Sequence, residues 1–115
     1  MRLGIIGSRT FNDEAKLIHI LDNIYNDVEI TLVVSGHAAG ADIMGERWAI
    51  ANNIKTLIFI PDWNKYGKRA GFVRNEDIIR NCDEVIAFWD CVSRGTLSSI
   101  KLAKQYNVPS IIISF

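Results

Sequence analysis

The segment from Val33 to Asp42 combines residue types that favour the binding of an anion. An apolar run stops at Ser35, and the turn after it contains Gly36 and Gly40. An Ala-rich stretch follows, with Asp42 in the first turn of an expected helix. The first amides of a helix lack intrahelical partners, and the helix dipole places partial positive charge beside them. The pattern therefore predicts a phosphate-binding loop, although a glycine turn also arises for steric reasons alone.

Three other segments place small or hydroxyl residues, or aromatic ones, beside charged side chains. They are Gly7-Ser8-Arg9, Asp90–Thr96 and Trp63–Asn75. Arg9 can pair with a phosphate as a two-pronged donor, and Gly95-Thr96 can offer amides and a hydroxyl at the start of a helix. Each segment also has an ordinary structural interpretation as a turn, a helix cap or a local hydrophobic plug. Their position in the fold must therefore decide between the two.

Short β-branched runs alternate with helical stretches along the chain. Strands are expected at residues 3–6, 30–34, 56–60, 84–89 and 110–115, and helices at 13–26, 39–53, 69–81 and 95–106. Most strands are apolar on both faces, which suits a parallel sheet covered on both sides. We therefore expect one α/β domain over residues 1–115, with a doubly wound parallel five-stranded sheet in the order 3-2-1-4-5 and two helices on each face. The longest expected irregular segment is 61–68.

In such a sheet, ligands bind beyond the carboxyl ends of the strands, where the strand order reverses. That point lies between the first and fourth strands, and the segments described above follow the strand ends. The expected ligand-binding residues are Gly7, Ser8, Arg9, Ser35, Gly36, His37, Ala38, Gly40, Asp42, Trp63, Tyr66, Lys68, Arg74, Asn75, Trp89, Asp90, Ser93, Gly95 and Thr96. Together they predict a small polyanionic ligand.

The expected residues divide by the part of the ligand that they suit. Phosphates would be held by the amides of 36–40 and of Gly95-Thr96. The cations that would neutralise the phosphates are Arg9, Lys68 and Arg74. The acids that would bind ribose hydroxyls are Asp42 and Asp90, and the aromatic residues that would face a base are Trp63, Tyr66 and Trp89.

Composition limits the classes of function. The 115 residues carry a formal net charge of zero, which argues against a protein whose main partner is a nucleic-acid backbone. No apolar run approaches the roughly 20 residues needed to span a bilayer, and a strand begins too early to leave room for a signal peptide. Cys82 and Cys91 fall near opposite ends of one expected strand, too far apart for a disulfide. These features favour a reduced, cytoplasmic protein.

Two further expectations follow from the residue pattern. His19 and His37 show no metal-site spacing with the cysteines, so we expect no metal and no required cofactor. The last expected strand, at 110–115, is very apolar and lies at an edge of the sheet. An uncovered apolar edge favours pairing with another subunit, so a homo-oligomer is expected.

Four motifs, in this order and spread over essentially the whole chain, resemble the YspA-type branch of the SLOG superfamily. The motifs are Gly7-Ser8-Arg9-Thr10-Phe11-Asn12-Asp13, Ser35-Gly36-x-Ala38-x-Gly40-Ala41-Asp42, Asp62-Trp63-x-x-Tyr66-Gly67-Lys68-x-Ala70-Gly71-x-x-Arg74-Asn75 and Ala87-Phe88-Trp89-Asp90-x-x-Ser93-x-Gly95-Thr96. The superfamily also includes the DNA-processing protein DprA and the Lonely Guy phosphoribohydrolases. The resemblance implies a Rossmann-like fold that binds a nucleotide, a nucleotide-derived signal such as an ADP-ribose relative, or single-stranded DNA. It also implies an association with phage or defence genes.

The chain departs from these relatives at three positions. The family usually has glycine where this chain has His37 and Cys91, and a Cβ there narrows the approach to the backbone or requires a permitted φ. His37 also brings a hydrogen-bond donor. Lonely Guy enzymes have a Gly-Thr-x-x-Glu pattern whose glutamate serves N-glycosidic cleavage, and Ser99 stands at that position here. Their activity is therefore not expected of this chain.

Three hypotheses of function follow. The leading hypothesis is a protein that binds a nucleotide or an ADP-ribose-like derivative, as a sensor or sequestering module. The second is a hydrolase of a nucleotide N-glycosidic or phosphate bond, with Asp42, Glu46 or Asp90 as acid or base. The third is a DprA-like single-stranded DNA binder that uses the cations and aromatic residues of 63–74, against which the zero net charge weighs.

Overall fold

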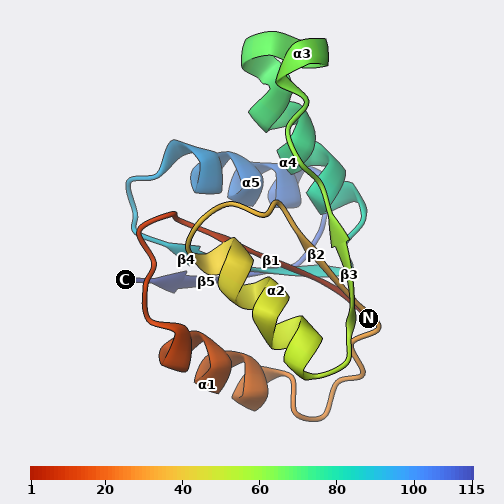
Figure 1. The fold of residues 1–115 in the computed structure, drawn as a ribbon, viewed down its shortest axis with the longest axis vertical. Helices are drawn as coiled ribbons and strands as arrows, with labels where there is room; N and C mark the ends of the chain where they lie inside the picture. The colour runs from red at the N-terminus through yellow and green to blue at the C-terminus, as the bar shows by residue number, and fades with distance from the viewer.

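The computed structural model describes all residues from 1 to 115. Its five strands form one parallel sheet in the order β3-β2-β1-β4-β5 (Figure 1). The strands are β1 (Arg2–Gly7), β2 (Leu32–Ser35), β3 (Lys55–Ile58), β4 (Glu84–Trp89) and β5 (Ser110–Ser114). The predicted α/β class and strand order are confirmed, with small differences at the strand ends.

Helices cover both faces of this sheet. They are α1 (Glu14–Ile24), α2 (Ala41–Ala51), α4 (Ala70–Arg80) and α5 (Arg94–Gln105). Figure 1 shows α1 and α2 on one face and α4 and α5 on the other, as predicted. The start of α1 is fixed by a side-chain cap, because the Asp13 carboxylate accepts a hydrogen bond from the amide of Lys16 at 3.1 Å.

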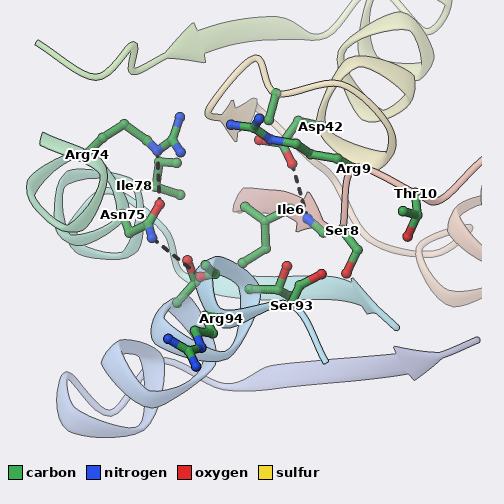
Figure 2. A pocket seen from close by; sticks show the side chains of 15 residues that line it. Ile6, Ser8, Arg9, Thr10, Asp42, Arg74, Asn75, Ile78, Ser93 and Arg94 are labelled. Carbon is green, nitrogen blue, oxygen red and sulfur yellow. Dashed lines mark hydrogen bonds between the residues drawn. The ribbon is translucent and has the colours of Figure 1, made fainter. Parts of the chain in front are cut away.

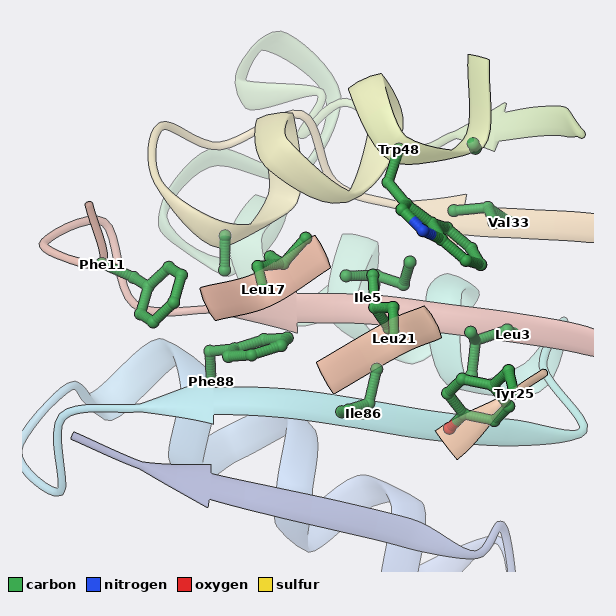
Figure 3. Close-up of a cluster of buried hydrophobic side chains, with 12 residues drawn as sticks. Leu3, Ile5, Phe11, Leu17, Leu21, Tyr25, Val33, Trp48, Ile86 and Phe88 are labelled. Carbon is green, nitrogen blue, oxygen red and sulfur yellow. The ribbon is translucent and has the colours of Figure 1, made fainter. Parts of the chain in front are cut away.

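The central strand β1 explains why the sheet needs helices on both sides. Side chains alternate between the two faces of a strand, so Ile5 packs into the cluster under α1 and α2, whereas Ile6 packs into the cluster under α4 and α5. In the first cluster (Figure 3), the Phe11 and Phe88 rings lie 4.9 Å apart between centroids. Burial of each such side chain contributes roughly 1.5–3 kcal/mol, which makes these two clusters the main source of stability.

The segment expected to be irregular contains two short helical turns. They are α3 (Trp63–Tyr66) and the 3-10 turn η1 (Gly67–Arg69). The Asp62 carboxylate caps α3 by accepting from the amide of Lys65 at 3.0 Å. α3 buries none of its residues and projects away from the sheet (Figure 1). A four-residue helix held by one local cap leaves no hydrophobic periodicity, so the sequence pattern could not predict it.

The two cysteines form no disulfide, as expected from their separation along the chain. Both cysteines are free, with Cys82 buried and Cys91 exposed. None of the helices is both long enough and apolar enough to cross a membrane.

Candidate functional site

A cavity of about 350 Å³ opens at the carboxyl ends of β1 and β4, where the strand order reverses (Figure 2). Its walls come from the end of β1, the start of α2, one side of α4 and the first turns of α5. The predicted site residues that line it are Gly7, Ser8, Arg9, Ala38, Asp42, Arg74, Asn75, Ser93, Gly95 and Thr96. The cavity therefore brings together residues from all four of the sequence motifs.

Three arginines, Arg9, Arg74 and Arg94, line this cavity with a single carboxylate, that of Asp42. Arg74 is fixed in place, because its Nη1 donates to the Gly36 carbonyl at 2.9 Å and its Nε to Oδ1 of Asn75 at 2.9 Å. Burial lowers the pKa of Arg74, and the nearby positive charge of Arg9 lowers it further while Asp42 opposes the shift. A bound anion would relieve this crowding of positive charge.

The first turn of α5 forms another wall of the cavity. Its first three residues, Arg94, Gly95 and Thr96, have backbone N–H groups with no hydrogen-bond acceptor in the protein. Ser93, the residue before the helix, does not cap them, because its Oγ donates to Asp90 at 2.8 Å instead. A Cβ placed on Gly95 would meet nothing within 4 Å, so the space beside these amides is open. This is the arrangement that binds phosphate at helix N-termini.

Two buried hydroxyls line the cavity beside this helix start. Thr96 is 6% exposed and Ser99 is 4% exposed, and both line the cavity. Neither hydroxyl bonds within the protein and neither is fully enclosed, since the one fully buried side-chain polar atom without a partner is the Tyr25 hydroxyl. They are therefore ready to bind a polar ligand that reaches the floor of the cavity.

Asp42 connects the ends of β1 and β2 through its carboxylate. It is 5% exposed and accepts from the amides of Gly7 and Gly36, each at 3.1 Å. Burial raises the pKa of Asp42 to about 6, against the opposing effects of Arg74 and the nearby backbone amides. Of the amides of 36–40 that are predicted to hold phosphate, that of Gly36 is therefore already bound to this carboxylate.

Gly40 keeps the same loop close to the end of β1. Its φ is +88°, and an added Cβ would lie 2.5 Å from the carbonyl oxygen of Ser8. Only glycine tolerates both the left-handed backbone and this close approach. Gly40 therefore shapes the wall of the cavity without lining it.

Ser35, His37 and Glu46 form a separate hydrogen-bonded group outside the cavity. Glu46 is 6% exposed and lies 2.7 Å from the Ser35 Oγ, which donates to it, and 2.6 Å from Nδ1 of His37. His37 has a φ of +58°, in the region that favours glycine. Through these contacts Ser35 and Glu46 hold the loop in place, and neither side chain lines the cavity.

Asp90 organises the turn between β4 and α5. Its carboxylate accepts from the amides of Val92 and Ser93 at 3.0 and 2.7 Å, and these bonds lower the pKa of Asp90 to about 2. Its own amide donates to the Ser8 Oγ at 3.1 Å. Trp89 is likewise occupied, because its Nε1 donates to the Ser93 carbonyl at 3.1 Å. Neither residue lines the cavity.

The remaining predicted residues lie on the projecting segment. Trp63, Tyr66 and Lys68 belong to α3 and η1, and none of them lines the cavity. Trp63 is 59% exposed, so it does not fold back as a hydrophobic plug. The lining residues that were not predicted as ligand-binding are Ile6, Thr10, Ile78, Arg94 and Ser99. Ser99 had a signal in the sequence, because a position three residues after Thr96 falls on the same face of a helix.

Comparisons with known proteins agree with this architecture. The sequence model described as the YspA, cpYpsA-related SLOG family matches residues 1–66. The Gene 61 protein of Mycobacterium phage D29 is 32% identical over 117 residues, which cover 96% of this chain and 94% of that protein. The solved structure of DNA processing protein A from Helicobacter pylori, which binds single-stranded DNA, matches with a TM-score of 0.75 at 23% identity. That match covers 97% of this chain and 64% of the larger protein, and it shows a shared fold.

Proposed function

Because this chain belongs to the YspA, cpYpsA-related SLOG family, we propose that its crevice binds a nucleotide or an ADP-ribose-like nucleotide derivative as a sensor or sequestering module. One observation carries the proposal: the free amides that begin α5 lie in the same cavity as three arginines. Both features favour a phosphate group. The amides have no acceptor within the protein, and the three arginines share the single carboxylate of Asp42 in the cavity lining.

Under this proposal, different parts of the ligand would occupy different parts of the cavity. A phosphate bound to the amides of Gly95 and Thr96 would also face the guanidinium of Arg9 or Arg74. The unpaired hydroxyls of Thr96 and Ser99 suit the hydroxyls of a ribose. No aromatic residue lines the cavity, so the base of the ligand would lie toward its open mouth. A volume of about 350 Å³ is within the usual range for small-molecule sites.

The carboxylates favour binding over cleavage. Asp42 is the one acid that lines the cavity, and two amides already hold it. Glu46 and Asp90 use their oxygens within the protein and lie outside the lining. General acid–base catalysis needs a carboxyl group within reach of the reacting atom. We therefore propose that the ligand leaves the site intact, and chromatography of ADP-ribose incubated with excess protein tests this directly.

Arg9→Ala tests the proposed ligand site. Saturating ADP-ribose is expected to raise the melting temperature of the wild type, since a ligand at about 100 times its Kd adds about 2.7 kcal/mol. Arg9 is exposed and lines the cavity, so its removal is expected to abolish most of this shift without unfolding the chain. Lys16→Ala removes an exposed cation from α1 and is expected to keep the full shift. Absence of a wild-type shift across a panel of nucleotides and ADP-ribose would refute the proposal.

A second candidate function is the binding of single-stranded DNA by the projecting segment. Trp63 and Tyr66 are exposed there, and the cations beside them are Lys65, Lys68 and Arg69. The Lys65 ammonium lies 5.1 Å from the centre of the Tyr66 ring. Aromatic residues interleaved with cations suit the stacking of bases along a charged strand. The likeness to the Helicobacter pylori protein supports this candidate at the level of the fold.

A gel shift with a labelled single-stranded oligonucleotide separates the two candidates. If the projecting segment binds DNA, retardation weakens as salt rises and is lost in Trp63→Ala, whereas Arg9→Ala retains it. Lack of retardation at low salt would dispose of this candidate. The thermal shift with ADP-ribose does not depend on Trp63, so the two experiments give independent answers.

A further inference from the structure

The outer edge of β5 has no partner strand. β5 lies at the end of the sheet and pairs only with β4 (Figure 1). The Pro109 carbonyl accepts from Val85 at 2.9 Å, and the Phe115 amide donates to Trp89 at 3.2 Å. Backbone groups of successive residues point to opposite sides of a strand, so the odd-numbered residues of this segment face β4.

The even-numbered residues therefore turn their backbone groups outward. The N–H and C=O groups of Ser110, Ile112 and Ser114 face away from β4 and have no partner in the protein. Edge strands are usually protected by charged side chains, by a bulge or by a covering element. β5 has no charged residue, and Ile112 is 46% exposed. An edge of this kind is suited to hydrogen bonding with another strand.

The sequence of β5 favours a second copy of the same strand as its partner. The strand is Ser-Ile-Ile-Ile-Ser, which is the same in both directions. We propose that two copies of this chain pair through β5 in antiparallel orientation, about a two-fold axis at Ile112. Ile112 then faces Ile112 of the second copy, and Ser110 faces Ser114. The pairing is isologous, as in most homodimers.

The proposed register uses every outward-facing backbone group. In an antiparallel pair, opposite residues whose groups point at one another exchange both N–H···O bonds. With the axis at Ile112, each outward-facing residue of one copy falls opposite an outward-facing residue of the other. Ile111 then faces Ile113 of the second copy on the α1 side, where both already pack against the first cluster. A shift by one residue would lose both the backbone hydrogen bonds and the pairing of Ile111 with Ile113.

The proposed interface is separate from the crevice. No residue of β5 lines the cavity, and the proposal does not rest on the proposed ligand. Pairing joins the two sheets into one continuous sheet and leaves both crevices open. Dimer formation and ligand binding can therefore be measured independently.

Native mass spectrometry and light scattering test the pairing. The wild type is expected at about twice the chain mass of 13.0 kDa. Ile112→Lys places two ammonium groups face to face at the axis, and Ile112→Pro removes an outward N–H without the loss of a bond to β4. Each is expected to weaken the dimer at least tenfold. Ile50→Lys changes an isoleucine that is 68% exposed on α2 and is expected to retain the dimer.

Two results would overturn the proposal. One is a wild-type chain that stays at 13.0 kDa at high micromolar concentration. The other is a dimer that survives both Ile112 substitutions while circular dichroism shows that the variants are folded. Since Ile112→Lys changes only a half-exposed side chain, it keeps the test decisive even if Ile112→Pro fails to fold.

Discussion

At the scale of single residues, the structure assigns most of the polar atoms of the loops to each other. Asp90 stands at a strand end, which made it a candidate for ribose binding, yet nearby donors of its own loop already occupy its carboxylate. Gly36 belongs to the glycine-rich turn, yet its amide binds Asp42. Residue type and spacing predict which side chains meet at a site. They do not predict which of the atoms remain free, because that depends on contacts made only in the folded chain.

His37 and Cys91 are the two residues at which a departure from glycine is expected from the sequence. His37 and Cys91 have φ values of +58° and +69°, in the left-handed region that costs a residue with a Cβ about 1–3 kcal/mol. His37 compensates through its contact with Glu46 at 2.6 Å. Cys91 is exposed, and nothing in the structure compensates its strain. Both residues therefore keep a backbone conformation that favours glycine.

Asp42 gives the stability of the protein a dependence on pH. Its folded pKa of about 6 lies above the ordinary 3.8, so the folded state holds the proton more tightly than the unfolded state. Asp42 therefore favours folding most below pH 3.8, and this contribution is lost as the pH rises through about 6. At about 1.4 kcal/mol per pKa unit, the loss is about 3 kcal/mol.

Asp42→Asn isolates this effect. The variant cannot titrate at this position, and its amide leaves one backbone donor unpaired, at a cost of about 1–3 kcal/mol at every pH. The unfolding free energy of the wild type minus that of the variant is therefore expected to fall by about 2 kcal/mol between pH 4 and pH 7, because the unfolded carboxyl is already partly ionised at pH 4. Urea denaturation at both pH values measures this difference. An equal difference at the two values would show that Asp42 does not titrate in this range.

At the scale of secondary-structure elements, α5 depends on the turn that precedes it. The backbone amides that begin this helix are the proposed phosphate donors, and Asp90 fixes the turn through Val92 and Ser93. α3 instead has a true local cap, because the Asp62 carboxylate accepts from the Lys65 amide within the helix. Asp62 thus caps an amide of its helix, whereas Asp90 orders the turn before its helix and leaves the first amides of α5 free.

Asp90→Ala and Asp62→Ala form a matched pair that tests this difference. Asp90→Ala is expected to lower the melting temperature and to weaken ADP-ribose binding at least tenfold, because the start of α5 loses its support. Asp62→Ala is expected to change neither quantity, since α3 buries none of its residues. Calorimetric titration and thermal unfolding of both variants provide the measurements. Equal effects of the two substitutions would contradict the role given to the turn before α5.

At the scale of the whole molecule, hydrophobic patterning was enough to predict the architecture. Strands that are apolar on both faces, such as β1 with Ile5 and Ile6, permit only a sheet with two helical layers. The strand order then placed the crevice, because ligands bind where that order reverses. The projecting α3 was missed because its start depends on the single cap by Asp62 and no core contact supports it.

The same isolation of α3 has a practical consequence for how this protein can change. A segment that contributes no residue to either core can be replaced, shortened or given a new sequence with little effect on folding. Substitutions at Trp63 and its neighbours are therefore expected to leave the sheet and the crevice as they are. The segment is accordingly a place where a probe can be attached without disturbing either the core or the crevice.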